Sequence, residues 1–167
     1  YGLTKPHLDW RVPQTYFDLH PIEEIKLPPV KKGDLSDIPV FGRKLAREVY
    51  DPSNERNFAV KPDGDHVNVV AHGQWRKAVQ AYLATISFAD AQVGRVLDSL
   101  DRSVHARKTI VVLWGDHGWH LGEKEHWRKH ALWEVSTRTP LIFWVPGGAV
   151  KGQLCQRPVS LIDIYPT

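Results

Sequence analysis

The sequence of 167 residues contains no methionine and a single cysteine, Cys155. A chain that begins at Tyr1 and has no methionine anywhere lacks a native start, so we expect an internal piece of a longer protein. The lone cysteine excludes a disulfide within the chain. It neither supports nor excludes a secreted protein, because a single cysteine does not indicate whether the protein folds in an oxidising or a reducing compartment.

Long apolar runs and clusters of like charge are also absent. No stretch approaches the roughly 18 apolar residues of a membrane span. The chain has 22 basic and 19 acidic residues, a net charge of +3, and the two signs are interleaved along the sequence. Because binding to phosphate backbones or lipid surfaces relies on clustered basic charge, we expect neither nucleic acid nor membrane as a partner.

Apolar residues are abundant and follow clear patterns. They make up 42% of the chain, including seven tryptophans, enough for a sizeable core in one domain. Across Trp75–Leu100 they recur every three or four residues, which predicts an amphipathic helix. Lys108–Trp114 and Leu141–Val145 are apolar almost throughout, which predicts strands of a sheet covered on both faces. This alternation of helix and strand indicates an α/β fold.

The remaining segments are less regular. Residues 1–40 are punctuated by prolines and are interpreted as loop, with one helical turn near Pro13–Leu19. Gly42–Tyr50 has helical composition, whereas Asp51–Gly73 is interpreted as an irregular excursion. Val159–Tyr165 is expected to be a short helix or strand, stopped by the proline that follows.

The loop Gly115–Lys129 carries the residues that indicate a function. Asp116 and His117 directly follow the predicted strand, and α/β sheets bind their ligands beyond the carboxyl ends of strands. A carboxylate beside an imidazole can hold Ca²⁺ or Mg²⁺ if further oxygens come from elsewhere. The alternative is a turn residue beside a hydrogen-bonded imidazole. Gly118 and Gly122 favour a ligand, since glycine allows the backbone to approach one closely.

Zinc is a second metal hypothesis for this loop. Four of the nine histidines lie close together, at 117, 120, 126 and 130. His126 and His130 are four residues apart and would share one face of a helix. The His-Glu-x-x-His order of zinc proteases is absent, however, and Cys155 has no cysteine partner.

Two further residues have both a functional and an ordinary interpretation. Lys129 is either a solvated surface lysine or an ammonium directed at a tetrahedral anion. His7 follows Pro6, which stiffens the backbone ahead of it. It is either a loop histidine with satisfied hydrogen bonds or a general acid.

Several of these segments together resemble a known family. Asp-His-Gly-Trp-His-Leu-Gly-Glu at 116–123, Trp-Arg-Lys at 127–129 and Thr-Arg-Thr-Pro-Leu-Ile at 137–142 resemble the type I sulfatases. The similarity is greatest to the iduronate-2-sulfatase-like branch, whose Lys-Pro-His loop resembles residues 5–7. Residues 82–97, 141–147 and 161–167 resemble the helix, strand and helix start of that branch in the same order.

The resemblance implies an alkaline phosphatase-like α/β fold, with a mostly parallel sheet and helices on both faces. Residues 1–167 would form the C-terminal part of the catalytic domain and leave that fold incomplete. The implied activity is hydrolysis of a sulfate ester, which in this branch is expected to be a sulfated carbohydrate. A periplasmic, secreted or lysosomal location is implied as well.

The resemblance also implies roles for individual residues. Asp116 and His117 match two ligands of a bound Ca²⁺, with Mg²⁺ as the alternative. Lys129 matches a lysine that binds the sulfate oxygens, and His7 matches a histidine near the leaving-group oxygen. Trp119 would form part of the pocket wall or serve as a packed aromatic.

The chain departs from the family at the nucleophile. In the family a formylglycine is made from the cysteine of a Cys-x-Pro-x-Arg motif, whereas Cys155 is followed by Gln-Arg-Pro. An Asp-Asp metal pair is missing too. We therefore expect the parent protein to be a sulfuric ester hydrolase and this chain alone to be inactive. A phosphonate or phosphate ester hydrolase of the same superfamily and a non-catalytic remnant module are the alternatives.

Overall fold

The structure is a computed structural model that describes residues 1–50, 58–60, 64–148 and 152–167. Its helices, 3₁₀ turns and strands follow one another as α1 (Gln14–Phe17), η1 (Ile22–Glu24), α2 (Val40–Ala46), β1 (Glu48–Tyr50), β2 (Phe58–Val60), α3 (Gly64–Ala71), α4 (Trp75–Asp101), η2 (Ala106–Lys108), β3 (Val111–Trp114), β4 (His120–Leu121), η3 (Glu123–Glu125), β5 (Trp127–Arg128), α5 (Glu134–Thr137), β6 (Leu141–Trp144) and η4 (Leu161–Ile164). None of the described helices is both long and apolar enough to cross a membrane.

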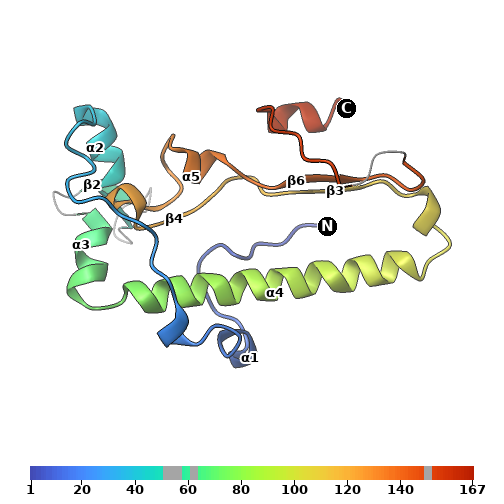
Figure 1. Ribbon diagram of the computed structural model, residues 1–167, viewed down its shortest axis with the longest axis horizontal. Coiled ribbons are helices and arrows are strands. Elements are labelled where there is room, and N and C mark those ends of the chain that lie inside the picture. The colour runs from blue at the N-terminus through green and yellow to red at the C-terminus, as the bar shows by residue number, and fades with distance from the viewer. Residues whose placement is uncertain (51–57, 61–63, 149–151) are drawn as a thin grey trace.

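The long helix α4 runs along most of the length of the molecule (Figure 1). It has 27 residues, which confirms the helix predicted from the periodicity of Trp75–Leu100. The helix buries Val79, Ala84 and Thr85, and it contacts α1 and η1. The single helical turn expected near Pro13–Leu19 is α1. The apolar stripe of α4 thus anchors the proline-rich N-terminal segment to the rest of the chain.

The predicted strands are present, but they pair differently from the expectation. Three two-stranded ladders connect the described strands, β1–β2, β3–β6 and β4–β5, and all three are antiparallel. The mostly parallel sheet is therefore not found among them. A parallel return needs a crossover of a dozen or more residues, usually a helix packed on the sheet. Between β3 and β6, a stretch that the structure describes throughout, the only α-helix is the one-turn α5. The chain returns to the end of β3, where Gly115 N–H donates to Pro140 O at 3.1 Å.

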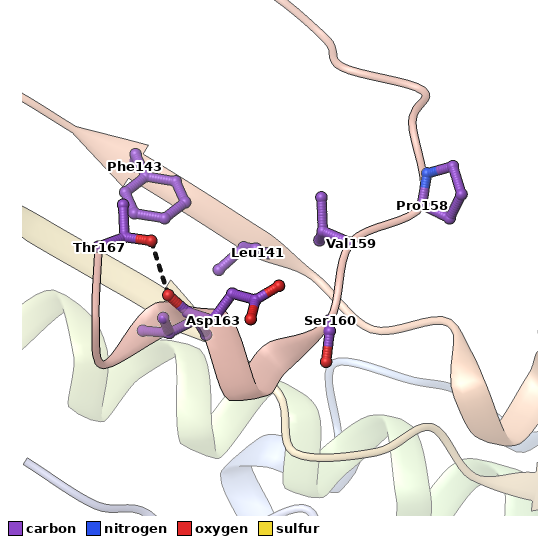
Figure 2. Close-up of a pocket in the computed structure, with 8 residues that line it drawn as sticks. Leu141, Phe143, Pro158, Val159, Ser160, Asp163 and Thr167 are labelled. Carbon is purple, nitrogen blue, oxygen red and sulfur yellow. Dashed lines mark hydrogen bonds between the residues drawn. The ribbon is translucent and has the colours of Figure 1, made fainter.

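The β3–β6 ladder is not covered on both faces, contrary to the prediction. Trp114, Ile142 and Phe143 remain 51%, 54% and 51% exposed. The C-terminal η4 lies beside β6 and leaves a hollow of about 480 Å³ between them (Figure 2). The described residues provide no second helical layer here, so the apolar strand residues stay in contact with solvent.

The core lies instead around the N-terminal half of α4 and the β4–β5 hairpin. Its buried members are Ile25, Val79, Trp119, Leu121 and Trp127. The indole N–H of Trp75 donates to Leu121 O at 2.6 Å and fixes the hairpin to the start of α4. Because Trp119 belongs to this core, the loop that follows β3 is held by the best-packed part of the molecule.

Three predictions for irregular segments need correction or completion. The helix within Gly42–Tyr50 ends at Ala46, and strand β1 takes up the last three residues. The segment interpreted as an irregular excursion contains α3, whereas residues 51–57 and 61–63 lie outside the described chain. The choice between helix and strand for Val159–Tyr165 is settled by the 3₁₀ turn η4.

Candidate functional site

Asp116 and His117 lie just beyond the carboxyl end of β3, as predicted. The Nδ1 atom of His117 is 2.8 Å from the carbonyl oxygen of Gly118, and a carbonyl can only accept, so Nδ1 carries the proton. The other ring nitrogen, Nε2, lies 3.5 Å from Oδ2 of the exposed Asp116 carboxylate, and in the neutral imidazole it would carry the lone pair. A histidine fixed through one nitrogen, with the other beside a carboxylate, has the arrangement of a metal ligand.

Three of the predicted residues converge on Trp119. The ring of His7 meets this indole edge-on, with the two centroids 5.2 Å apart. The ring of His117 lies 6.2 Å from it, and the Lys129 ammonium lies 5.7 Å from the indole centroid. Trp119 itself is only 8% exposed. The structure therefore brings together residues more than 100 positions apart in the sequence, around one packed aromatic side chain.

The two glycines of the loop serve the protein rather than a ligand. Gly118 N–H donates to Ser136 O at 2.7 Å, and a Cβ atom here would lie 1.9 Å from Val135 O. Gly122 has φ +123°, and a Cβ atom there would lie 2.7 Å from the Trp75 ring. We interpreted these glycines from the sequence as allowing close approach of a ligand. The structure instead explains them by the close packing of the loop on α5 and α4.

His120 and His126 form a buried pair rather than a zinc site. Both side chains are fully buried, and their rings meet edge to face with centroids 4.9 Å apart. His126 Nδ1 donates to Ala46 O at 3.0 Å, and His120 Nδ1 lies 2.9 Å from Ser136 Oγ. Desolvation lowers the pKa of each imidazole to about 4. The segment after His126 is strand, not helix, and no three possible metal ligands group together in the described parts of the chain.

The hairpin before Lys129 is held in strained backbone conformations. Lys124 and Arg128 have φ values of 57° and 74°, a region that costs a non-glycine residue about 1–2 kcal/mol. Each side chain is fixed by a carboxylate from a distant segment: Lys124 Nζ lies 2.8 Å from Asp34, and Arg128 Nη1 lies 2.5 Å from Asp65. These ion pairs hold the backbone that positions Lys129.

A second hollow beside Trp119 is lined by residues to which the sequence analysis gave no role: Trp10, Asp65, Trp127 and Arg128. Trp127 and Arg128 belong to the Trp-Arg-Lys motif at 127–129, and Trp10 lies three positions after His7, so these three lie close to predicted site residues in the sequence. Asp65 carried no such signal, since it sits in the segment interpreted as irregular. Only the tertiary structure brings α3 next to β5.

Comparison with known proteins finds relatives that cover most of the chain. The family model described as Sulfatase matches residues 39–167. The chain belongs to the sulfatase family. A sulfatase of Formosa agariphila is 45% identical over 166 residues, which cover 99% of this chain and 30% of that protein. Human iduronate 2-sulfatase is 36% identical over 152 residues, covering 87% of this chain and 26% of the human protein. The chain thus spans between a quarter and a third of the length of these relatives.

A solved structure shares the fold of this sulfatase chain. The structure of BT4656 in complex with its substrate D-glucosamine-2-N,6-O-disulfate aligns with a TM-score of 0.58 and 18% sequence identity. The alignment covers 85% of this chain and 37% of that one. The chain therefore shares the fold of part of that structure.

Proposed function

We propose that this chain supplies the sulfate-binding side of the active site in a hydrolase of sulfated carbohydrates. The observation that carries the proposal is the convergence of His7, His117 and Lys129 on Trp119. Membership of the sulfatase family supports it independently. The preference for a carbohydrate rests on the similarity to iduronate 2-sulfatase and on a fold neighbour whose substrate is a sulfated glucosamine.

Each side chain has a distinct chemical task in this proposal. The ammonium of Lys129 offsets negative charge on the sulfuryl oxygens as the ester bond breaks. The His7 imidazole gives a proton to the departing sugar oxygen, which would otherwise leave as a costly alkoxide. Its Nδ1 atom lies 2.9 Å from Leu8 O, so Nε2 is the nitrogen left for that proton transfer. The nucleophile, a formylglycine in this family, comes from outside the chain.

Asp116 and His117 are the residues that would hold a metal. We infer calcium, with magnesium as the alternative, because a carboxylate is a preferred ligand of both ions. The bound ion would polarise the sulfuryl group. At least one more ligand must come from outside this part of the protein, because the described chain holds no group of three candidates. Thermal unfolding of the full-length protein with Ca²⁺ or with a chelator tests this, and an unchanged midpoint would contradict it.

We also propose that strands outside this chain complete a mostly parallel sheet. Trp114, Ile142 and Phe143 are about half exposed, which is unusual for apolar residues of a central strand. Strands and helices from the rest of a longer protein would cover them. The structure of the full-length protein tests this directly.

Lys129→Ala in the full-length protein tests the proposed site. We expect turnover of sulfated sugars to fall about 10²- to 10³-fold, the usual effect of removing one group that stabilises transition-state charge. Lys77→Ala is the matched control, since Lys77 is exposed on α4. Unchanged turnover in Lys129→Ala would refute the assignment of this residue. Turnover of phosphate or phosphonate esters alone would favour the related hydrolases, and no turnover of any ester would favour a non-catalytic module.

A further inference from the structure

The peptide unit between Pro6 and His7 is held at both of its polar atoms. The indole N–H of Trp10 donates to the carbonyl oxygen of Pro6 at 3.0 Å. The amide N–H of His7 donates to the carbonyl oxygen of Thr4 at 2.9 Å. Because a peptide unit is planar, two hydrogen bonds on its opposite edges fix its orientation, and they thereby restrict the direction in which the His7 side chain leaves the backbone.

The imidazole of His7 is restrained as well. Its Nδ1 atom lies 2.9 Å from the carbonyl oxygen of Leu8, and its ring meets the Trp119 indole edge-on with centroids 5.2 Å apart. Thr4 and Leu8 belong to the same loop as His7, so their hydrogen bonds shape the loop without attaching it to a distant segment. The hydrogen bond from Trp10 differs, because the ring of Trp10 packs outside the loop.

The ring of Trp10 is anchored in the body of the protein. It meets the ring of Tyr82 in α4 edge to face, with centroids 5.9 Å apart, and it meets Trp119 at 6.3 Å. Tyr82 in turn stacks on Trp119, with centroids 6.3 Å apart. The three rings lie against or within the hydrophobic core, and aromatic pairs of this kind favour one relative orientation. Trp10 therefore connects the peptide in front of His7 to the long helix.

The segment that carries His7 and Trp10 has a second attachment further along the chain. His20 Nε2 lies 2.8 Å from Ser87 Oγ, and the side-chain amide of Gln80 donates to the His20 carbonyl oxygen at 2.8 Å. Ser87 and Gln80 both belong to α4, which α1 and η1 also contact on either side of His20 (Figure 1). This attachment holds the segment on the helix but does not touch the loop around His7.

We propose that Trp10 is a positioning residue for the general acid: by holding the Pro6 carbonyl, its indole N–H directs His7 Nε2 at the departing sugar oxygen. The inference rests on the proposed function, because the placement matters only if His7 protonates the leaving group. Proton transfer requires the two heavy atoms to lie about 2.6–3.2 Å apart, so a small displacement of the imidazole slows it. Lys129 lies on another segment, and its binding of sulfate should not depend on this hydrogen bond.

Trp10→Phe in the full-length protein removes the N–H donor and keeps an aromatic ring against Tyr82 and Trp119. We expect kcat for a sulfated sugar to fall about tenfold, the scale of one lost hydrogen bond, with KM and the inhibition constant of inorganic sulfate unchanged. Turnover of para-nitrophenyl sulfate should stay at the wild-type rate, since its phenolate departs without a proton. A general packing defect would slow both substrates.

A double-mutant cycle with His7→Ala measures whether Trp10 acts through His7. His7→Ala alone should lower turnover of the sugar about 10²- to 10⁴-fold, the usual contribution of a general acid. On that background Trp10→Phe should have no further effect. Ser87→Ala is the matched control, because it removes a hydrogen bond between the same segment and α4, and it should leave the rates of both substrates unchanged.

The outcomes distinguish this assignment from the proposed function. An unchanged sugar rate in Trp10→Phe, equal losses for the two substrates, additive effects with His7→Ala, or an equal effect of Ser87→Ala would each overturn the role of Trp10 and leave the sulfatase function standing. If Trp10→Phe fails to fold, benzothienylalanine at position 10, which has the shape of tryptophan without its N–H, takes its place with the same expectations. Unchanged turnover in His7→Ala would instead refute the acid proposed for the reaction.

Discussion

At the scale of a single residue, Trp119 belongs both to the hydrophobic core and to the proposed site. It packs in the core with Leu121 and Trp127, and it also gives His7 and Lys129 a common surface. A side chain buried on most sides holds its rotamer through packing, so the groups in contact with it are positioned as well. The neighbouring Gly118 is restricted by a different contact, since a Cβ atom there would meet the backbone oxygen of Val135 in α5.

Gly118→Ala should destabilise the protein by about 1–3 kcal/mol, the usual cost of overpacking. The added Cβ would lie 1.9 Å from Val135 O, so either the loop or α5 would have to move. Chemical denaturation of the full-length protein measures the change.

Gly94→Ala is the matched control in the same experiment. Nothing lies within 4 Å of a Cβ atom at Gly94, which is inside α4, so alanine should stabilise the helix by about 0.5–1 kcal/mol. Equal effects at the two glycines would contradict the packing described for Gly118.

At the scale of elements, the β4–β5 hairpin is the part that positions Lys129. Its two buried histidines connect it to α5 through Ser136 and to the end of α2 through Ala46. Neither contact follows from the sequence, because both join segments brought together only by the fold. The motif 116–129 could be singled out from the sequence, but the helix that the zinc hypothesis required for His126 and His130 is absent, because strand β5 follows His126.

The buried histidine pair predicts a loss of stability in acid. The pKa of each imidazole is about 4 in the folded protein, below the ordinary 6.5 expected when the chain is unfolded. As the pH falls below about 6.5, the unfolded state therefore binds protons that the folded state does not, and the free energy of unfolding decreases until about pH 4. Each histidine contributes at most about 1.4 kcal/mol per pH unit.

Urea denaturation between pH 7 and pH 4.5 measures this slope. His126→Asn should reduce it, since an asparagine amide can still donate to Ala46 O but does not take up a proton. His105→Asn, at an exposed position after α4, should keep the wild-type slope. A slope that is the same in all three proteins would show that His126 does not titrate with unfolding.

At the scale of the whole molecule, the chain has one well-packed end and one open end. The core surrounds the start of α4, whereas the β3–β6 ladder leaves Ile142, Phe143 and Trp144 about half exposed. Successive strand residues point to opposite faces, so apolar side chains are exposed on both faces of this ladder, where other protein surface would pack. The rest of a sulfatase-length protein would supply such a surface.

Residues 1–167 produced alone should therefore self-associate and hydrolyse no sulfate ester. The exposed apolar strand drives association, and the nucleophile is missing because Cys155 is not in the family motif. Sedimentation velocity and a sulfate-release assay measure both. A monomer with measurable turnover would contradict this account of the chain.

The helices and strands that could be predicted are those specified by a local pattern of apolar residues in the sequence. The helix α4 was predictable because 27 residues repeat one apolar stripe, and β3 and β6 were predictable because their apolar runs are short and bounded. His7, Asp116, His117, Trp119 and Lys129 were named from local motifs together with the resemblance to the sulfatases that those motifs carry. The antiparallel pairing of β3 with β6, the buried histidine pair and the Arg128–Asp65 ion pair became known only from the tertiary structure. These features join residues far apart in the chain, and such contacts depend on packing that no local pattern encodes.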